Sequence, residues 1–595
     1  MRSSFLSRRS VSALKYKIAA LTILLVATPV ASGFSAEVKQ PIRSTRPVNA
    51  LNLQPDETLE FDVVIAGGST AAFAAALASA ESGARTALIE PTDWVGGQLT
   101  SSGVPAVDEA WHTVGNLKSG EATLNVAQIA RNPANITPNF LAALQAIESP
   151  GECWVSRFCF CPDRFLERQL LPLQRHAGER LTVYLNTVVK HVELSDRGSL
   201  IRSLTAIART AKPGVTSNGY DRLPSVDLPD WYSPQPSKRF DKRILRFAGT
   251  SRVGRNTVFI DATEWGEILA LSGVPYLQGI EDSDGSQHGN DTCGQATVFC
   301  LVEEFLAEPR DEAKRDVHVE NLGFGAYRDQ SDAWQRIWTY RRIRGRGDPS
   351  PGDLSLQNWG YSLELQEGGN DYPFGYLFKS REATARERAN WQGGVDLKVM
   401  TAAEQRALAW HAWFKQHAPP EIDSRRIVLN SQVLGTSHGL AKLPYIRDTR
   451  RSIGLDSFVL RFADLSGPAA QRTGTRFEDR IALGAYPADI HALAKCPVPL
   501  YIHDTHDTLP FYIPFRALTN NQLGNLLVAG KTMAQSFLAN SATRLHPIEW
   551  SSGTAAGVSA AWMARNGKSS RQAYSSIKDF QSSIKDRTPI DWQLK

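Results

Sequence analysis

The sequence predicts an α/β protein built on a parallel sheet, with a second α+β region inserted into it. Three observations predict this. Residues 60–97 alternate strand, glycine turn, helix and strand, and short buried-strand patterns return at 256–262 and 525–530. The stretch from 276 to 520 instead has long polar loops, many aromatic residues and scattered strands. This order is typical of a chain that leaves one domain, builds another and returns.

The opening unit is the most strongly patterned part of the chain. An apolar run at 61–66 predicts a buried strand, and Gly67-Gly68-Ser69-Thr70 predicts a tight turn. The alanine-rich run 71–81 predicts a helix, and Gly83 ends it. Residues 84–89 predict a second strand that finishes on Glu90. Together these elements predict one βαβ unit.

This unit carries the marks of a dinucleotide site. The pattern G-x-G-x-x-G falls on Gly67, Ser69 and Ala72, so serine and alanine replace the second and third glycines. The turn and the helix N-terminus favour a pyrophosphate, and an acid about 20 residues further on, here Glu90, favours a ribose diol. The hydroxyl of Ser69 is expected to donate to a phosphate. A plain βαβ unit without a nucleotide is the alternative.

Charge excludes two classes of partner. The net charge of the 595 residues is +5, and the five basic residues of 1–36, which contain no acid, account for all of it. The remainder is electrically neutral overall, so there is no electrostatic case for nucleic acid or an anionic membrane.

The first 36 residues resemble a signal peptide. A basic segment precedes the apolar residues 18–30, which are too few for a spanning helix of ~20 residues, and small residues follow. Arg8-Arg9 lies in a context similar to the bacterial twin-arginine signal, with an ordinary Sec signal as the alternative. The prediction is a periplasmic or secreted protein without a stable membrane anchor after cleavage.

An oxidising compartment makes disulfides the expected state of the cysteines, with buried thiols as the alternative. Their connectivity stays open, and no second ligand pair with zinc spacing follows Cys159 and Cys161. The run 503–507, with two histidines and two aspartates, is interpreted as a solvated loop rather than a metal site. The six cysteines are Cys153, Cys159, Cys161, Cys293, Cys300 and Cys496.

The remaining segments complete the expected organisation. A helix is expected over 162–174, a strand-like stretch over 181–194, a surface loop over 211–240, a helix over 402–416 and a closing helix over 547–566. The expected divisions are a signal peptide (1–36), a linker (37–57), a nucleotide-binding domain (58–275, with an insertion at about 108–162), a substrate domain (276–520), a return to the first domain (521–570) and a C-terminal tail (571–595).

Several separate stretches, in this order, resemble the FAD-dependent oxidoreductases of the glutathione-reductase-like superfamily. The resemblance spans residues 60–566 and implies a Rossmann-like FAD-binding domain with an inserted α+β substrate domain. FAD is the implied cofactor. The stretches are DVVIAGGSTAA, WVGGQLTSSGV, VFIDATEWGEILALSGVPY, SLQNW with GGNDYPF, LPYIRDTRR, and NLLVAGKTMAQS with SATRLHPIEWSSGTAAG.

The resemblance implies a set of cofactor-binding residues, each of which has packing or a plain loop as its alternative. In the last helix, small residues are expected to let the positive N-terminus face the flavin. The implied residues are Gly67, Gly68, Ser69, Thr70 and Ala71 for the pyrophosphate, Glu90 for the ribose, Gly96, Gly97 and Gln98 for the ribityl chain and flavin, Val188 for adenine, Asp261, Ala262 and Thr263 for the second strand end, Gly530 and Lys531 for the ribityl chain, and Gly553, Ala555 and Ala556 in the last helix.

Catalytic candidates come from the inserted region and from the loop before the last helix. His546 is proposed to move a substrate proton, and Arg544 to hold a carboxylate or stabilise reduced flavin. Arg447 and its neighbours Arg450 and Arg451 form a candidate clamp for an anion, although arginines in such loops often pair with acids. Further pocket candidates are His438, Asn358, Trp359, Asn370, Asp371 and Tyr372.

The resulting functional prediction is a dehydrogenase or oxidase. It takes a hydride from a small organic substrate onto the flavin and passes electrons to oxygen or an external acceptor. No second glycine-rich fingerprint is evident, which argues against an NAD(P)H site. Two alternatives stay open: a carbohydrate-active lyase or polysaccharide-processing flavoprotein, and a binding protein without redox turnover.

Overall fold

The predicted parallel sheet is present, with five strands among the described residues. The computed structural model describes residues 53–109, 117–119, 122–148, 150–281, 290–312, 319–467, 471–494, 496 and 506–594. All neighbouring pairs in the sheet are parallel. In sheet order the strands are β23 (Leu526–Val528), β10 (Val258–Asp261), β2 (Val63–Ala66), β3 (Thr86–Ile89) and β6 (Leu181–Tyr184).

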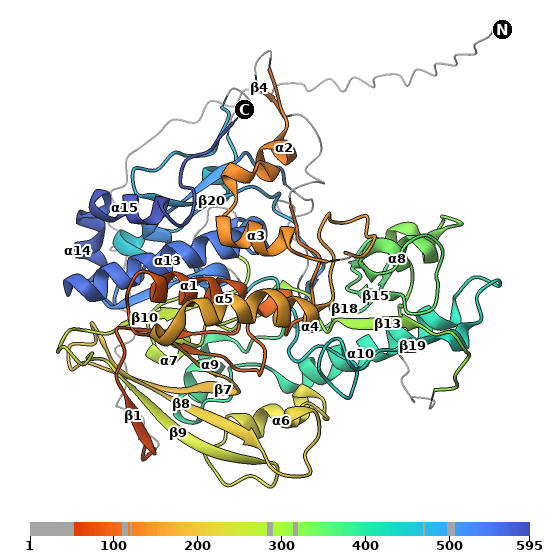
Figure 1. Cartoon of the computed structure of the whole chain (residues 1–595), viewed down its shortest axis with the longest axis horizontal. Coiled ribbons are helices and arrows are strands. Elements are labelled where there is room, and N and C mark those ends of the chain that lie inside the picture. Colours follow the sequence, from red (N-terminus) through yellow and green to blue (C-terminus); the bar gives the residue numbers. More distant parts are fainter. Residues whose placement is uncertain are drawn as a thin grey trace, which may run out of the picture. The chain divides into compact units, whose positions relative to one another are not determined.

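One face of this sheet is covered by two helices that are distant in sequence (Figure 1). These are α1 (Thr70–Glu81) and α13 (His546–Asn566). A Cβ on Gly553 would lie 2.2 Å from the carbonyl oxygen of Ala71, and a Cβ on Gly557 would lie 2.2 Å from that of Ala75. The small residues of α13 therefore let the two helix backbones touch. Close packing, which the sequence analysis gave as the alternative role of these residues, is thus present.

The other face of the parallel sheet packs against a second sheet. Alternation along β2 sends Val63 and Ile65 to the helix side, and Val64 to the opposite core. The stretch 181–194, expected as one strand, turns at Asn186 (φ 52°) and enters both sheets. Asn tolerates this left-handed conformation better than most residues. The second sheet runs β1 (Glu57–Leu59), β9 (Phe240–Ala248), β8 (Ile201–Ala211) and β7 (Thr187–Leu194).

The segment 211–240 is not simply the surface loop that its prolines predict. It contains α6 (Pro224–Trp231), which begins at a proline, and Leu228, Trp231 and Tyr232 are buried. The large apolar side chains outweigh the proline content because they join the core below the parallel sheet.

The inserted region has its own antiparallel sheet and the long helix α10 (Leu397–Gln416), shown in green to teal in Figure 1. The helix starts five residues earlier than 402 because the side chain of Asp396 caps it by accepting from Lys398 N–H. The sheet order is β14 (Arg342–Arg344), β15 (Leu354–Gln357), β13 (Leu301–Phe305) and β19 (Ile427–Leu429).

The C-terminal segment expected as a tail is helical and anchored to the core. Phe580 and Ile584 are fully buried, because α15 (Ile577–Lys585) is amphipathic and packs these residues against the hydrophobic cluster that contains residues of α13.

The other helices of the described residues are α2 (Val126–Arg131), α3 (Pro138–Gln145), α4 (Pro162–Phe165), α5 (Leu171–His176), α7 (Glu267–Ser272), α8 (Ala333–Tyr340), α9 (Arg381–Glu387), α11 (Phe462–Leu465), α12 (Phe537–Thr543) and α14 (Ser570–Ser575).

Short two-stranded pairs also occur among the described residues. They are β4 (Leu117–Ser119) with β5 (Ala122–Leu124), β11 (Gly294–Gln295) with β21 (Leu493–Ala494), β12 (Thr297–Val298) with β18 (Asp371–Tyr372), β16 (Tyr361–Ser362) with β17 (Glu367–Gly368), and β20 (Arg480–Gly484) with β22 (Phe511–Pro514).

The predicted signal peptide and most of the linker lie outside the described residues. Within the described ranges, no helix combines the length and apolar character needed to cross a membrane. The domain boundaries stay predictions.

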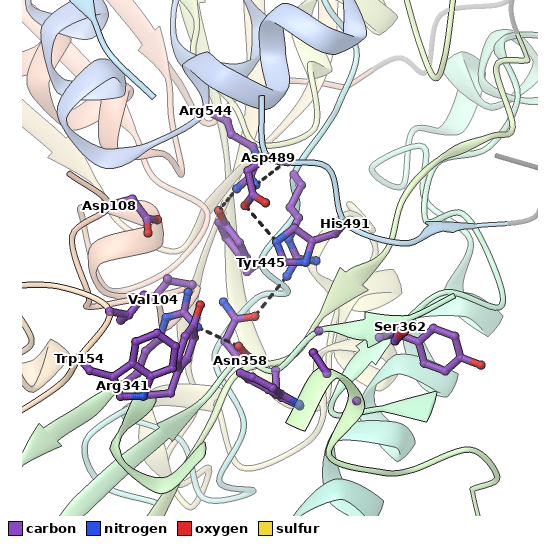
Figure 2. A pocket seen from close by; sticks show the side chains of 18 of the residues that line it. Val104, Asp108, Trp154, Arg341, Asn358, Ser362, Tyr445, Asp489, His491 and Arg544 are labelled. Carbon is purple, nitrogen blue, oxygen red and sulfur yellow. Dashed lines mark hydrogen bonds and ion pairs between the residues drawn. The ribbon is translucent and has the colours of Figure 1, made fainter. Parts of the chain in front are cut away.

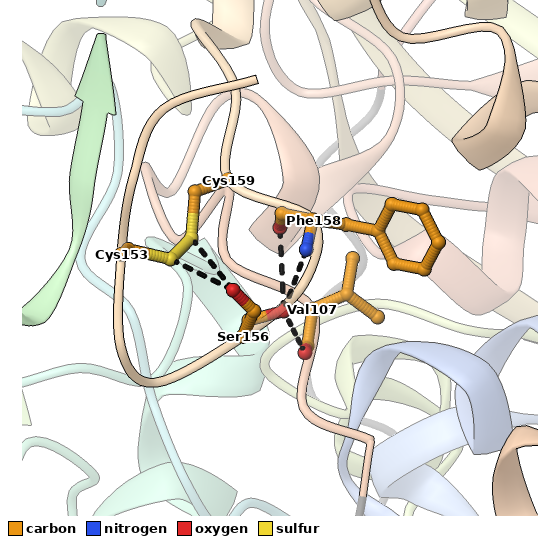
Figure 3. The surroundings of a disulfide bond; sticks show 5 residues. All are labelled: Val107, Cys153, Ser156, Phe158 and Cys159. Carbon is orange, nitrogen blue, oxygen red and sulfur yellow. Dashed lines mark hydrogen bonds between the residues drawn. A yellow bond between two sulfur atoms is a disulfide. The ribbon is translucent and has the colours of Figure 1, made fainter. Parts of the chain in front are cut away.

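Four of the six cysteines form disulfides. Cys153 pairs with Cys159, and Cys293 pairs with Cys496. The first bond closes the loop 153–159. Ser156 in this loop is hydrogen-bonded to the adjacent segment of the same chain, because its hydroxyl donates to the carbonyl of Val107 at 2.6 Å (Figure 3). Cys161 and Cys300 are free thiols.

A buried charge network ties α10 to β13. His411 Nδ1 lies 2.7 Å from a Glu303 oxygen, and Nε2 lies 3.0 Å from a Glu312 oxygen that also binds Lys415 at 2.8 Å. Burial opposes protonation of His411, but the two carboxylates outweigh it and raise its pKa from 6.5 to about 9. Burial likewise raises the pKa of Glu303, so only part of the gain at His411 is net stabilisation.

Replacement of Gly557 by alanine should destabilise the fold. Helix propensity alone would favour alanine by about 1 kcal/mol, whereas the added methyl would overlap Ala75, an overpacking cost of about 1–3 kcal/mol. We expect a lower unfolding temperature for Gly557→Ala by calorimetry. Asn566→Ala, at the exposed end of the same helix, is the control and should change little. A rise in unfolding temperature for Gly557→Ala would contradict the packing.

The His411 network should make stability depend on pH. Because the pKa of His411 is raised, the stabilisation from its ion pairs with Glu303 and Glu312 is complete below pH 6.5. It is lost as the pH rises through about 9. At 1.36 kcal/mol per pKa unit it is on the order of 3 kcal/mol at most. The unfolding-temperature gap between the natural protein and His411→Gln should therefore narrow from pH 7 to pH 10. His417→Gln, exposed at the residue that follows α10, is the control, and a constant gap for His411→Gln would refute the network.

Candidate functional site

The turn after β2 has the geometry of an anion site. A Cβ on Gly67 would lie 2.8 Å from the carbonyl oxygen of Ile89, so only glycine fits there. The Ser69 hydroxyl accepts from Ala72 N–H at 3.1 Å and donates to the Ala262 carbonyl at 2.6 Å, which joins the turn to the end of β10. The sequence predicted that the Ser69 hydroxyl donates to a phosphate, but in the structure it donates to a carbonyl of the protein itself. The N–H groups of Thr70 and Ala71 begin the helix and have no acceptor within it.

The second glycine turn lies directly against the first. Gly96 and Gly97 have positive φ angles of 108° and 57°, and a Cβ on Gly97 would lie 2.7 Å from Thr70 N. The Thr70 hydroxyl donates to the Gly96 carbonyl at 2.8 Å. Gln98 is fully buried and donates through Nε2 to the Arg544 carbonyl at 3.1 Å. Its Oε1 has no hydrogen-bond partner among the described residues.

The acid at the end of β3, Glu90, is buried beside the start of β7. Thr92 donates to Glu90 Oε1 from its N–H at 3.2 Å and from its hydroxyl at 3.0 Å. Burial nevertheless raises the Glu90 pKa to about 8. The N–H of Thr187 donates to the Glu90 carbonyl at 2.8 Å, which places Val188 next to this acid.

A buried cation lies at the other strand ends. Lys531 Nζ is 3.0 Å from Glu264 and 2.8 Å from Glu549, which lies in the first turn of α13. Burial opposes its protonation, but the two carboxylates outweigh burial and raise its pKa. Asp261 accepts from Thr263 and Leu269 N–H groups, so its carboxylate organises the loop before α7.

Predicted cofactor residues from three stretches share one narrow cleft. Gly67, Gly68, Val188 and Thr263 line one cavity, and Leu228, Trp231 and Tyr232 line it from the segment 211–240. The residues fit a dinucleotide: helix N–H groups, glycines that a Cβ would fill, and the unpaired Oε1 of Gln98. The cavity itself measures about 10 Å³. Gly553, Ala555 and Ala556 are buried in α13, and their role towards flavin stays a prediction.

A larger cavity of about 390 Å³ lies beside these residues (Figure 2). Arg544 lines it while its carbonyl holds Gln98, and Tyr445 lines it while its ring lies 5.9 Å from Lys531 Nζ. The predicted candidates Arg447, Asn358 and Trp359 also line it. Other lining residues, which the sequence did not single out, are Asp108, Trp154, Tyr340, Arg341, Tyr486, Asp489 and His491.

A continuous polar network runs along this cavity. Arg447 binds Asp371 at 2.8 Å, and the other oxygen of Asp371 lies 3.1 Å from His491 Nδ1. Asp489 lies 3.3 Å from His491 Nε2 and 3.1 Å from Arg544. Each of the two arginines is therefore paired with an aspartate, and His491 lies between those aspartates.

Arg341 is the third arginine of this cavity. Its Nη1 donates to the Asn358 carbonyl at 2.9 Å, and its guanidinium carbon lies 4.4 Å from the Tyr340 ring centroid. Four arginines in the run 341–346 were the only signal for it in the sequence. Tyr445 belongs to the quoted stretch LPYIRDTRR, whereas nothing local marks Asp489 or His491.

The predicted catalytic histidines lie outside this cavity's lining. His546 is fully buried, donates from Nε2 to the Val104 carbonyl at 2.8 Å, and accepts at Nδ1 from Asp108 N–H at 3.3 Å. Burial lowers its pKa to about 4. His438 is half-buried and accepts from Leu440 N–H. Both stay predictions as catalytic groups.

The remaining candidates have structural partners. Arg450 donates to the Trp265 and Gly394 carbonyls, and Arg451 pairs with Glu281 at 2.6 Å. Asn370 binds the Phe299 and Gln357 carbonyls. In the histidine–aspartate run, 503–505 lie outside the described residues. In the part of the chain that is described, no three His, Cys, Asp or Glu side chains gather as a metal site.

Comparison with known proteins identifies the family. The family model for FAD dependent oxidoreductase matches residues 62–217 and 244–584. A comparison with curated proteins finds no match.

Among solved structures, one similar chain is L-proline dehydrogenase from P. horikoshii, with 13% identity, TM-score 0.13, and 38% of this chain and 26% of that chain covered. A geranylgeranyl bacteriochlorophyll reductase-like protein from Thermoplasma acidophilum has 10% identity, TM-score 0.26 and coverages of 89% and 85%. Quinol fumarate reductase FrdA from E. coli has 12% identity, TM-score 0.27 and coverages of 89% and 74%. By the family match over most of its length, the chain belongs to the FAD-dependent oxidoreductases, with FAD as cofactor.

Proposed function

We propose that this protein is an exported dehydrogenase or oxidase that takes a hydride from a small organic substrate held in the 390 Å³ cavity. Oxygen or an external carrier then receives the electrons. One observation carries the proposal: Arg544 and Tyr445 line this cavity and also contact Gln98 and Lys531, which the family resemblance assigns to the flavin. A substrate there would lie beside the redox group.

Three groups of residues would hold FAD. The N–H groups of Thr70 and Ala71 would bind the pyrophosphate, and Glu90 would bind the adenosine ribose. Gln98, with its unpaired Oε1, would meet the flavin end. Bound FAD supplies a two-electron acceptor for a hydride.

His491 is the proposed proton acceptor of the reaction. Oxidation of an alcohol or amine breaks a C–H bond, whose electron pair leaves as hydride, and an O–H or N–H bond, whose proton needs a base. His491 lines the cavity with 27% of its side chain exposed, and Asp371 and Asp489 flank it. His546 instead holds the 104–108 loop in place.

Anaerobic reduction tests the function. We expect the purified protein to be yellow, to release FAD on denaturation, and to bleach with one member of a panel of amines, alcohols and sugars. His491→Gln should slow bleaching by about 10²–10⁴-fold, while His176→Gln, on exposed α5, should not. A colourless protein would reject the function, and unchanged bleaching in His491→Gln would reject only the base.

Export is part of the proposal because of Arg8-Arg9 and the disulfides. Disulfides persist in oxidising compartments, and two are present here. The proposed FAD site combines α1, the end of β10 and α13, so it is complete only after the whole chain has folded. A twin-arginine route moves folded proteins and would carry FAD across with the protein.

Conservative replacement of the arginine pair tests the route. Arg8→Lys with Arg9→Lys keeps the charge of the N-terminal region, so a Sec signal should function unchanged. We expect loss of export, with yellow protein retained in the cytoplasm, measured by fractionation. Lys15→Arg with Lys17→Arg is the matched control. Normal export of the double-lysine variant would leave an ordinary Sec signal.

A further inference from the structure

We infer that the substrate of this protein carries a carboxylate, and that Arg341 is the residue that anchors it. The inference rests on the proposed function, because it names the class of molecule oxidised in the 390 Å³ cavity. It also moves the anionic contact from Arg447 and Arg544, the sequence-predicted arginines that line this cavity, to a third one.

Within the described part of the chain, Arg341 is a buried cation without a counter-ion. Only 8% of the residue is exposed, and among the described residues no carboxylate oxygen lies within 4.0 Å of its guanidinium. Its Nε has no hydrogen-bond partner in the same part of the chain. The adjacent Arg342 is fully buried too but pairs with Asp353. A buried charge normally requires such a partner, so a ligand anion would complete the environment of Arg341.

The other two arginines are less available. Arg447 and Arg544 already hold Asp371 and Asp489, at 2.8 Å and 3.1 Å. A ligand carboxylate at either site would have to displace an aspartate or share its arginine. Figure 2 shows Arg341 beside Trp154, apart from the Arg544–Asp489 pair.

One acid restricts which anions fit. Asp108 lines the same cavity, and its charge favours the protonated form of Arg341 at longer range. The Tyr486 hydroxyl donates to it at 3.4 Å, and His546 Nδ1 lies 3.7 Å from its other oxygen. Asp108 would repel a second ligand carboxylate, so the cavity favours a monocarboxylate over a dicarboxylate.

Aromatic side chains next to Arg341 indicate the shape of the substrate. Trp154 and Trp359 flank Tyr340, with ring centroids 4.6 Å and 5.2 Å from it, and all three rings line the cavity. Trp154 is 40% exposed. The Cys153–Cys159 disulfide closes the loop that carries it. Such walls favour a flat apolar body beside the carboxylate.

Calorimetric titration of the purified protein tests the inference with matched probes. Phenylacetate should bind at least tenfold more tightly than neutral phenylacetamide, and more tightly than phenylsuccinate with its second carboxylate. Arg341→Gln should weaken phenylacetate binding about ten- to hundredfold, because a charge-assisted pair is lost. Arg341→Lys, which keeps the charge without the bidentate fork, should lose less. Arg346→Gln, exposed in the same arginine-rich run, should bind normally.

The FAD spectrum of each variant reports cofactor content, so loss of fold is separated from loss of the anion contact. If Arg341→Gln does not fold, Arg341→Lys carries the test. Any of three results would overturn the inference. They are equal affinity for phenylacetate and phenylacetamide, absence of phenylacetate binding, and unchanged phenylacetate binding in Arg341→Gln, or in Arg341→Lys where that variant carries the test. Bleaching by uncharged substrates alone would reject the carboxylate and leave the proposed function intact. Phenylacetate binding without bleaching by any substrate, carboxylates included, would reject the function and keep the anion contact.

Discussion

Direct backbone contact between α1 and α13 is the constraint on which the rest of the structure depends. The contact needs Gly553 and Gly557, since a Cβ on either would overlap the Ala71 or Ala75 carbonyl. It brings the first turn of α13, with Glu549, to the start of α1 and to Gly530, where a Cβ would lie 2.9 Å from Ala71. Residues from opposite ends of the chain therefore meet at the carboxyl ends of the parallel strands, where open α/β sheets bind ligands.

Buried charge fixes what this backbone contact brings together. Lys531 is held by Glu264 and Glu549, and Arg447 and Arg544 by Asp371 and Asp489. Buried pairs often contribute little net stability, because desolvation offsets the attraction, but breaking one leaves an unpaired charge. They therefore specify position more than they stabilise. This is why Arg341, which has no carboxylate partner among the described residues, stands out among the arginines that line the larger cavity.

The parts of the fold that local chemistry determines could be predicted from the sequence, and the parts that depend on distant contacts could not. The βαβ unit of 60–97 is encoded by its own apolar runs and glycines, so strand, turn and helix were all predicted correctly. The division of 181–194 between two sheets depends on one left-handed residue, Asn186. The burial of α6 depends on a core formed by other segments. In the candidate site, Asn358 and Arg447 belong to recognisable stretches, but His491 acquires its setting only from Asp371, which is 120 residues away.

Arg544 connects the cofactor side of the candidate site to the substrate side. Its carbonyl accepts from Gln98 in the second glycine turn, while its guanidinium binds Tyr445 and Asp489 in the larger cavity. The 96–98 turn and Arg544 are therefore mechanically linked. Any shift of this turn would carry the Arg544 carbonyl with it or break the hydrogen bond from Gln98. Because Asp489 also binds His491, such a movement would reach the proposed base through two contacts. The second glycine turn and His491 are thus joined through one buried arginine.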